Sequence, residues 1–213
     1  MANILLGATG SVAAVRVPVL CEALVASGHA VQVVATDAAA YFFDSRTMKT
    51  PVVRDADEWP GRDAGQLYQR GDAVLHIELR KWADLFLIAP LDANTMAKLA
   101  VGLCDNCLTC VWRAWDLAKP VVLAPAMNTL MWQHSFTRRH LKAIAADTGA
   151  AHIPGHLDDQ QLIAQINDRS KTLRVVSPIV KTLACGDEGI GAMAEVPAIV
   201  AAVNELLAKL QAA

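Results

Sequence analysis

Blocks of apolar residues along the chain predict buried β-strands that are separated by helices. The strand-like blocks are short and rich in Val, Leu, Ile and Ala, and each stops at a Gly, Thr or Pro where a turn begins. Strands that alternate with helices form a parallel sheet with helices on both faces, so the pattern predicts a doubly wound α/β fold. The predicted strands cover residues 3–6, 31–35, 85–89 and 120–124.

Helical spacing of apolar residues follows the predicted strands. The first helix has Val12, Val15, Val19 and Leu20 as its apolar face, and it ends near Ser27. Pro197 suits the first turn of the last helix. Further helices are predicted from residue 96, over 103–115 and over 130–146.

Four segments are less regular. Residues 44–70 are polar and are expected to form a connection with an edge strand or a short helix, and residues 74–79 are strand-like or a turn. Residues 156–174 are expected to be a polar surface insertion, part helical and poorly ordered. Residues 183–195 contain three glycines and are expected to form a flap over a site. No linker interrupts the chain, so residues 1–213 are predicted to form one domain.

Composition excludes several classes of function. The chain has 213 residues, of which 54% are hydrophobic and 19% charged, and its net charge is −2. No basic patch favours nucleic acid, and no apolar run approaches the roughly 20 residues that span a membrane. Without a predicted signal peptide, the five cysteines are expected to be free thiols, and a cytoplasmic location is expected.

The turn after the first strand is built from small residues. Gly7, Gly10 and Ser11 would let the backbone approach an anion at a helix N-terminus. The spacing is not that of the dinucleotide motif, so a single phosphate, as in FMN, is the better ligand. A plain turn with Ser11 as the helix N-cap explains the same residues about equally well.

Polar residues also follow two later strands. Asn94 and Thr95 come after one strand, and Asn128 comes after the next. Ligands of open parallel sheets bind in the crevice outside the carboxyl ends of the strands, so these side chains are candidate ligand contacts. Simple helix capping is the alternative.

The cysteines and histidines are ambiguous when each is taken alone. Cys104, Cys107 and Cys110 have a spacing that allows an iron–sulfur cluster, but a helix would separate them, and packing is favoured. Cys185 stands in the glycine-rich segment, where a thiol is either a proton donor or incidental. His76 is either a catalyst or an ordinary partly buried residue, and no histidine spacing suits a metal.

Six motifs taken together resemble the flavin-containing cysteine decarboxylases. The resemblance covers nearly the whole chain, and the last two motifs are the most specific. The motifs are GATGSVAA at 7–14, VLHIELRKWAD at 74–84, APLDANTMAKLA at 89–100, LCDNCLTCVWRAWD at 103–116, APAMNTLMW at 124–132 and LACGDEGIGAMAE at 183–195.

The resemblance implies a Rossmann-like, flavodoxin-like fold that binds FMN and assembles as a homotrimer with active sites at the subunit contacts. The implied reaction is decarboxylation of 4′-phosphopantothenoylcysteine to 4′-phosphopantetheine, through a thioaldehyde and an ene-thiolate. No metal, nucleic acid or membrane is implied. The implied FMN contacts are Gly10, Ser11, Val12, Thr36, Asp37, Ala38, Asp92, Ala93, Asn94, Thr95 and Ala126.

The resemblance also assigns catalytic and substrate residues. His76 matches the base of the oxidation step, and Cys185 matches the thiol that donates a proton from the flap. Asn128 matches the residue that holds the substrate carboxylate. The other implied substrate contacts are Met131, Lys81, Lys181, Ala184 and Gly186.

Two departures and three alternatives qualify this expectation. Lys81 stands where the family often has arginine, and Thr182 replaces a common basic residue, which leaves Lys181 to meet a phosphate. The alternatives are a non-catalytic regulator of protein phosphatases, a peptidyl-cysteine decarboxylase and a flavodoxin-like electron carrier. The last of these would need neither Asn128 nor Cys185.

Overall fold

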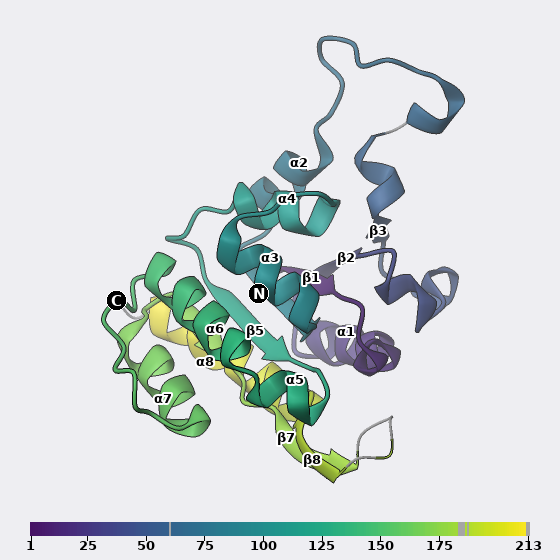
Figure 1. Ribbon diagram of the computed structural model, residues 1–213. Coiled ribbons are helices and arrows are strands. Elements are labelled where there is room, and N and C mark those ends of the chain that lie inside the picture. Colours follow the sequence, from purple (N-terminus) through teal and green to yellow (C-terminus); the bar gives the residue numbers. More distant parts are fainter. Residues whose placement is uncertain (60, 183–185, 187, 212–213) are drawn as a thin grey trace.

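Six parallel strands form the central sheet, as the sequence pattern predicts. The computed structural model describes residues 1–59, 61–182, 186 and 188–211 (Figure 1). The sheet order is β3-β2-β1-β4-β5-β6, so the order reverses between β1 and β4, as in doubly wound folds. The strands are β1 (Asn3–Ala8), β2 (Ala30–Ala35), β3 (Val52–Arg54), β4 (Leu85–Leu91), β5 (Val121–Pro125) and β6 (Leu173–Val175).

Successive residues of the central strands enter two separate hydrophobic cores. Leu5 and Phe86 pack into one core, whereas Leu6 and Leu87 pack into the other. All four side chains are fully buried. A strand whose two faces are both covered has no polar side, which explains why these strands read as continuous apolar runs.

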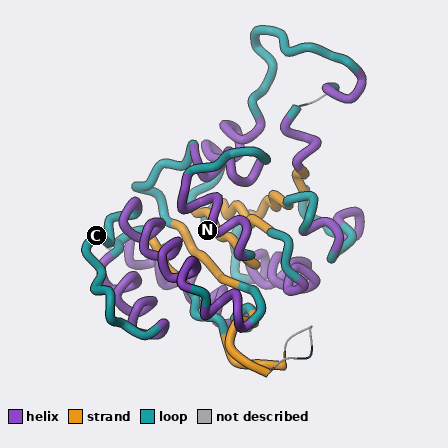
Figure 2. Tube along the Cα trace, in the orientation of Figure 1, coloured by secondary structure: helices purple, strands orange, loops and turns teal. Residues whose placement is uncertain are grey.

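Helices cover both faces of the sheet (Figures 1 and 2). One face packs against α1 (Val17–Ala26) and α8 (Val196–Gln211), and Val196 precedes Pro197 as predicted for the last helix. The helices that contribute to the other core are α2 (Leu75–Trp82), α3 (Ala93–Val101), α4 (Cys107–Arg113), α5 (Thr129–Gln133), α6 (Ser135–Asp147) and α7 (Asp159–Arg169).

The predicted apolar face of the first helix is correct at Leu20 and wrong at Val12, Val15 and Val19. Residues Val12–Arg16 form a short 3₁₀ helix, η1, before α1 begins, and this change of period shifts the buried face. Leu20 and Leu24 of α1 are fully buried, whereas Val12 and Val15 are about half exposed. Val12 and Val15 therefore lie at the protein surface, outside the face of α1 that packs against the sheet.

The expectation of a strand or turn at 74–79 is also wrong, because these residues begin helix α2. Apolar and polar letters alternate over these few positions and imitate a strand. The full segment places Leu75, Leu79 and Trp82 at i, i+4 and i+7, which is helical spacing. Leu79 is buried, and Leu75 and Trp82 pack against the same core.

The segment 156–174 is not a poorly ordered insertion. Asp158 accepts a hydrogen bond from the N–H of Gln161 and caps α7, which is followed by β6 at the edge of the sheet. Leu162 and Ile166 of α7 are fully buried. Polar residues occupy the outer face of this helix and dominate its composition, which hides the apolar stripe.

Two predicted helices are interrupted. The predicted helix 103–115 shortens to α4, because Gly102 ends α3 in a left-handed conformation and Asn106 caps α4. The predicted helix 130–146 divides into α5 and α6 at His134, which has extended backbone angles. The region 44–70 contains the edge strand β3, as expected.

An antiparallel hairpin forms a second, separate sheet. It pairs β7 (Ile179–Thr182) with β8 (Glu188–Ala192), and β8 packs beside α5. Residues 183–185 and 187, which include Ala184 and Cys185, lie outside the described residues. The part of the predicted flap that is described is thus the strand β8 with Gly186 and residues 193–195. Among the described helices, none has the length and apolarity needed to cross a membrane.

Candidate active site

Three turns converge at the carboxyl edge of the sheet. A Cβ added at Gly10, after β1, would lie 2.7 Å from Cβ of Ala38 and 3.2 Å from Oδ2 of Asp92. Ala38 follows β2 and Asp92 follows β4, so only glycine allows this approach. The predicted cofactor contacts Gly10, Ala38 and Asp92 are therefore neighbours in space.

Threonine hydroxyls hold these turns together. Oγ1 of Thr9 donates to the carbonyl of Pro90 at 2.8 Å and accepts from the N–H of Asp92 at 2.7 Å. Thr36 is buried, and its Oγ1 accepts from the N–H of Ala39. Because buried hydroxyls need partners, these bonds fix the shape of the edge.

Helix capping explains some of the polar residues at the strand ends. Oδ1 of Asp92 accepts from the N–H of Thr95 at 2.7 Å, so Asp92 is the cap of α3. Asn94 is left exposed, whereas Thr95 is buried. Oδ1 of Asn128 caps α5 through the N–H of Met131 at 2.8 Å, which leaves the amide NH₂ of Asn128 available.

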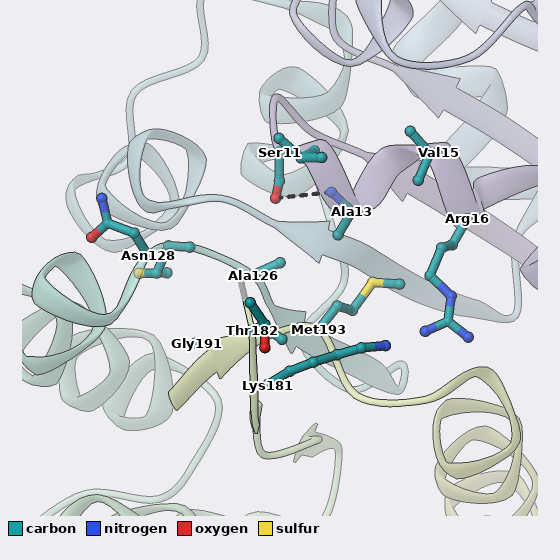
Figure 3. Close-up of a pocket in the computed structure, with 13 residues that line it drawn as sticks. Ser11, Ala13, Val15, Arg16, Ala126, Asn128, Lys181, Thr182, Gly191 and Met193 are labelled. Carbon is teal, nitrogen blue, oxygen red and sulfur yellow. Dashed lines mark hydrogen bonds between the residues drawn. The ribbon is translucent and has the colours of Figure 1, made fainter. Parts of the chain in front are cut away.

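A cavity of about 350 Å³ opens beside these turns. It lies between η1, the turn after β5 and the β7–β8 hairpin, and Figure 3 shows Asn128 at one end with Arg16 and Lys181 at the other. Predicted site residues that line it are Ser11, Val12, Ala126, Asn128 and Lys181. Ala126 is nearly buried, and its N–H donates to the carbonyl of Leu91.

The hairpin is seated against the turn after β5 by two glycines. A Cβ on Gly191 would lie 2.3 Å from the carbonyl oxygen of Met127, and a Cβ on Gly189 would lie 2.3 Å from Oγ1 of Thr129. The N–H of Met127 donates to the carbonyl of Gly191 at 2.9 Å. The glycines of the predicted flap therefore serve close backbone packing next to Asn128.

Charged groups gather at the Arg16 end of the cavity. Nη2 of Arg16 lies 2.7 Å from Glu195, and Nζ of Lys181 lies 3.4 Å from the same carboxylate. The Arg16 guanidinium, with Lys181, holds the pKa of Glu195 below its usual value. One carboxylate faces two cations, so a net positive charge remains near the cavity.

His76 lies in a different part of the chain. It is in the first turn of α2, and its Nδ1 forms a hydrogen bond with Oε1 of Glu58 in the short helix η4 (Asp55–Glu58). Lys81 of α2 is exposed and lies 3.4 Å from Glu78. No residue that lines the described cavity comes from α2, so one chain does not bring His76 and Lys81 together with Asn128 and Lys181.

The cysteine trio does not form a ligand set. Cys107 is fully buried and Cys104 is exposed. Burial, followed by the charge of Cys104, raises the pKa of the Cys110 thiol to about 11. Across the residues that the structure describes, no group of three His, Cys, Asp or Glu side chains could hold a metal ion.

The sequence analysis missed two residues of interest. Arg16 comes six positions after Gly10. Its position shortly after the glycine-rich turn is the sequence feature that could have identified it. Glu58 lies in the polar region 44–70, in which no site residue is predicted, although it is only 3% exposed. Glu58 stands beside Trp59 in a region with few apolar residues, so the sequence gives little indication that its side chain is buried.

Comparisons with known proteins agree on one family. A sequence profile described as Flavoprotein matches residues 1–208. The chain is 44% identical over 208 residues to the phosphopantothenoylcysteine decarboxylase of Mus musculus, covering 97% of this chain and 88% of that protein.

Solved structures give the same result. A PPC decarboxylase mutant complexed with pantothenoylaminoethenethiol is 41% identical with a TM-score of 0.79, covering 97% of this chain and 98% of that one. The FMN binding protein AtHal3 is 42% identical with a TM-score of 0.73, covering 96% of this chain and 95% of that one.

Proposed function

The chain belongs to the Flavoprotein family, and we propose that it catalyses the FMN-dependent decarboxylation of 4′-phosphopantothenoylcysteine to 4′-phosphopantetheine. The product is an intermediate of coenzyme A biosynthesis. The observation that carries the proposal is the similarity over nearly the whole chain to decarboxylases of this substrate, combined with a cavity at the carboxyl edge of the sheet.

The residues at the sheet edge fit FMN. The close approach at Gly10 packs the turn after β1 against Ala38 and Asp92, and Ser11 stands at the start of η1, the end of a helix that would meet a phosphate. We assign the flavin to the turns after β1, β2, β4 and β5. The residues of this assignment are Gly10, Ser11, Val12, Thr36, Asp37, Ala38, Asp92, Ala93, Asn94, Thr95 and Ala126.

When bound, FMN supplies a two-electron oxidant that converts the substrate thiol to a thioaldehyde, and this group accepts the electron pair that remains when carbon dioxide leaves. His76 takes the proton of the substrate thiol. The amide NH₂ of Asn128 holds the substrate carboxylate, since its Oδ1 is already used by α5. Cys185, outside the described residues, donates a proton to the ene-thiolate, and the two electrons taken up in the oxidation would return to it as a hydride from bound FMN, which gives the thiol of 4′-phosphopantetheine.

The cavity provides for the two ends of the substrate. Arg16 and Lys181 supply positive charge for the substrate phosphate at the end opposite Asn128. Lys81 adds charge from α2. Met131, Ala184 and Gly186 are assigned to the surrounding substrate contacts, and Met131 is about half exposed at the turn after β5.

We further propose that the active site is shared between subunits of a homotrimer in the cytoplasm. His76 and Asn128 belong to separate regions of one chain, so a neighbouring subunit has to bring them together. Exposed apolar side chains surround the cavity and favour burial by a second copy. They include Val12, Val15, Leu130, Met131 and Val180.

The alternative functions are less well supported. A phosphatase regulator without catalysis would not need the full set of His76, Asn128 and Cys185. A peptidyl-cysteine decarboxylase would act on a polypeptide C-terminus, whereas the similar curated proteins are named for the small substrate.

The test is to incubate the purified protein with 4′-phosphopantothenoylcysteine and identify the product by mass spectrometry. The proposal expects a yellow protein with a flavin spectrum and a product lighter by one carbon dioxide. The Cys185→Ser variant should accumulate an oxidised, decarboxylated product and reduced flavin. A colourless protein that leaves the substrate unchanged would refute the proposal.

A further inference from the structure

Glu58 is a buried carboxylate beside the proposed catalytic histidine. Its side chain is 2% exposed, and its Oε1 lies within hydrogen-bonding distance of Nδ1 of His76, whose side chain is 19% exposed. Glutamate is almost never fully buried without a partner. Among the described residues, His76 is the one basic side chain that pairs with Glu58.

Among the described residues, Glu58 has no second basic neighbour that would neutralise its charge. Its second oxygen, Oε2, is buried without a hydrogen-bond partner in the part of the chain that the structure describes. Burial, followed by a side-chain hydrogen bond with Glu58, raises the pKa of the Cys107 thiol, so Cys107 is an uncharged second neighbour of the carboxylate. The charge of Glu58 is therefore paired with the imidazole of His76.

The contact joins two segments that are far apart along the chain. Glu58 ends η4 and His76 begins α2, and the residues between them extend away from the sheet as an exposed arm (Figure 1). Leu67 and Tyr68 of this arm are 87% and 70% exposed. These exposed residues contribute little packing to the imidazole, so the hydrogen bond with Glu58 is the described polar contact that can fix its orientation.

We propose that Glu58 is a positioning residue that holds His76 in the tautomer with the proton on Nδ1 and leaves Nε2 as the base for the substrate thiol. A neutral imidazole carries one proton, so a carboxylate acceptor at Nδ1 selects this tautomer. Nε2 then takes the thiol proton, and the adjacent carbon would lose its hydrogen with two electrons, as a hydride, to the oxidant that bound FMN supplies. The carboxylate also stabilises the imidazolium that forms.

This inference rests on the proposed role of His76. The test measures the rate of flavin reduction by substrate, without oxygen, in the wild type and in Glu58→Gln, His76→Asn and Glu205→Gln. Glutamine matches the shape of glutamate, but its NH₂ can donate to Nδ1 and stabilise the wrong tautomer. Glu205, which is exposed on α8, is the matched control for loss of one carboxylate.

Glu58→Gln is expected to slow flavin reduction by at least ~10-fold, with FMN affinity, KM and thermal midpoint close to those of the wild type and of Glu205→Gln. A normal rate in Glu58→Gln with a slow rate in His76→Asn would overturn the inference alone. A normal rate in His76→Asn would instead refute the proposed role of His76. A slow rate explained by lost FMN or by a lower thermal midpoint would assign Glu58 a structural role and overturn the inference.

A second measurement needs no change at Glu58. In ¹⁵N-histidine-labelled wild-type protein, the signals of His76 are identified by their absence in His76→Asn. In the neutral ring, the inference expects a protonated Nδ1 and an unprotonated Nε2. The opposite assignment would overturn it, even if Glu58→Gln fails to fold.

Discussion

At the scale of single residues, the site depends on where a side chain is absent as much as on where one is present. Gly10 has no room for a Cβ because three turns meet there, whereas Gly155 has nothing within 4 Å of its Cβ position. Oδ1 of Asn128 caps α5, and its NH₂ has no hydrogen-bond partner among the described residues. The cap and the proposed substrate contact of Asn128 are therefore compatible.

Gly10→Ala tests the cradle at the sheet edge. The added methyl would meet Cβ of Ala38 at 2.7 Å, so the turns must separate and the phosphate should lose its backbone contacts. We expect FMN affinity to fall at least ~10-fold, about 1.4 kcal/mol, in a fluorescence titration of the apoprotein. Gly155→Ala should bind FMN normally, and equal affinities in the two variants would contradict the assignment.

The pH dependence of cysteine alkylation tests the packing of the cysteine trio. Because its pKa is raised to about 11, Cys110 should be protonated at pH 8, and only the thiolate reacts. Its alkylation rate, followed by mass spectrometry, should rise ~10-fold for each pH unit from 8 to 10. A rate that levels off near pH 9 would show an ordinary thiol instead.

At the scale of elements, the predictions from sequence succeed where apolar residues dominate a segment. The buried strands were predictable because both of their faces are apolar, as Leu5 and Leu6 illustrate. A helical part of 156–174 was expected, but the burial of α7 was missed because Leu162 and Ile166 are outnumbered by polar neighbours. The segment of His76 was too short to separate strand spacing from helical spacing.

The site was predictable only in part for a related reason. The turns after the strands follow from local motifs, and the structure brings Gly10, Ala38 and Asp92 together as neighbours. The Glu58–His76 contact joins positions 18 apart across an irregular arm, and no periodic pattern specifies such a contact. Whether a charged side chain is buried depends on the folded structure, so the amino-acid sequence alone does not reveal it.

Ile166→Ala tests whether α7 belongs to the core. Ile166 is fully buried, so its truncation should lower the free energy of unfolding by roughly 2–5 kcal/mol in urea denaturation. Asp168→Ala, on the exposed side of the same helix, should change it by less than about 0.5 kcal/mol. Equally small changes in the free energy of unfolding of both variants would instead indicate that residues 156–174 form a poorly ordered surface segment.

At the scale of the whole molecule, the proposed catalytic groups occupy two separate surfaces. Asn128 and Lys181 line the cavity by the β7–β8 hairpin, whereas His76 and Glu58 lie at the base of the arm. In the proposed function, a single chain thus holds two incomplete halves of the site. Assembly around a three-fold axis would pair the halves of neighbouring chains, and it would bury the apolar rim of the cavity.

The most direct test of an active site shared between subunits is to measure carbon dioxide release from 4′-phosphopantothenoylcysteine by mixed oligomers. His76→Asn and Asn128→Asp subunits, each with its own tag, are co-expressed and purified through both tags. Aspartate keeps the cap of α5 but repels the substrate carboxylate, so each variant alone should be nearly inactive. In a mixed trimer, one of three contacts combines an intact His76 with an intact Asn128. The account predicts activity of about one third of the wild type. Mixed oligomers as inactive as the single variants, beside an active wild type, would contradict it.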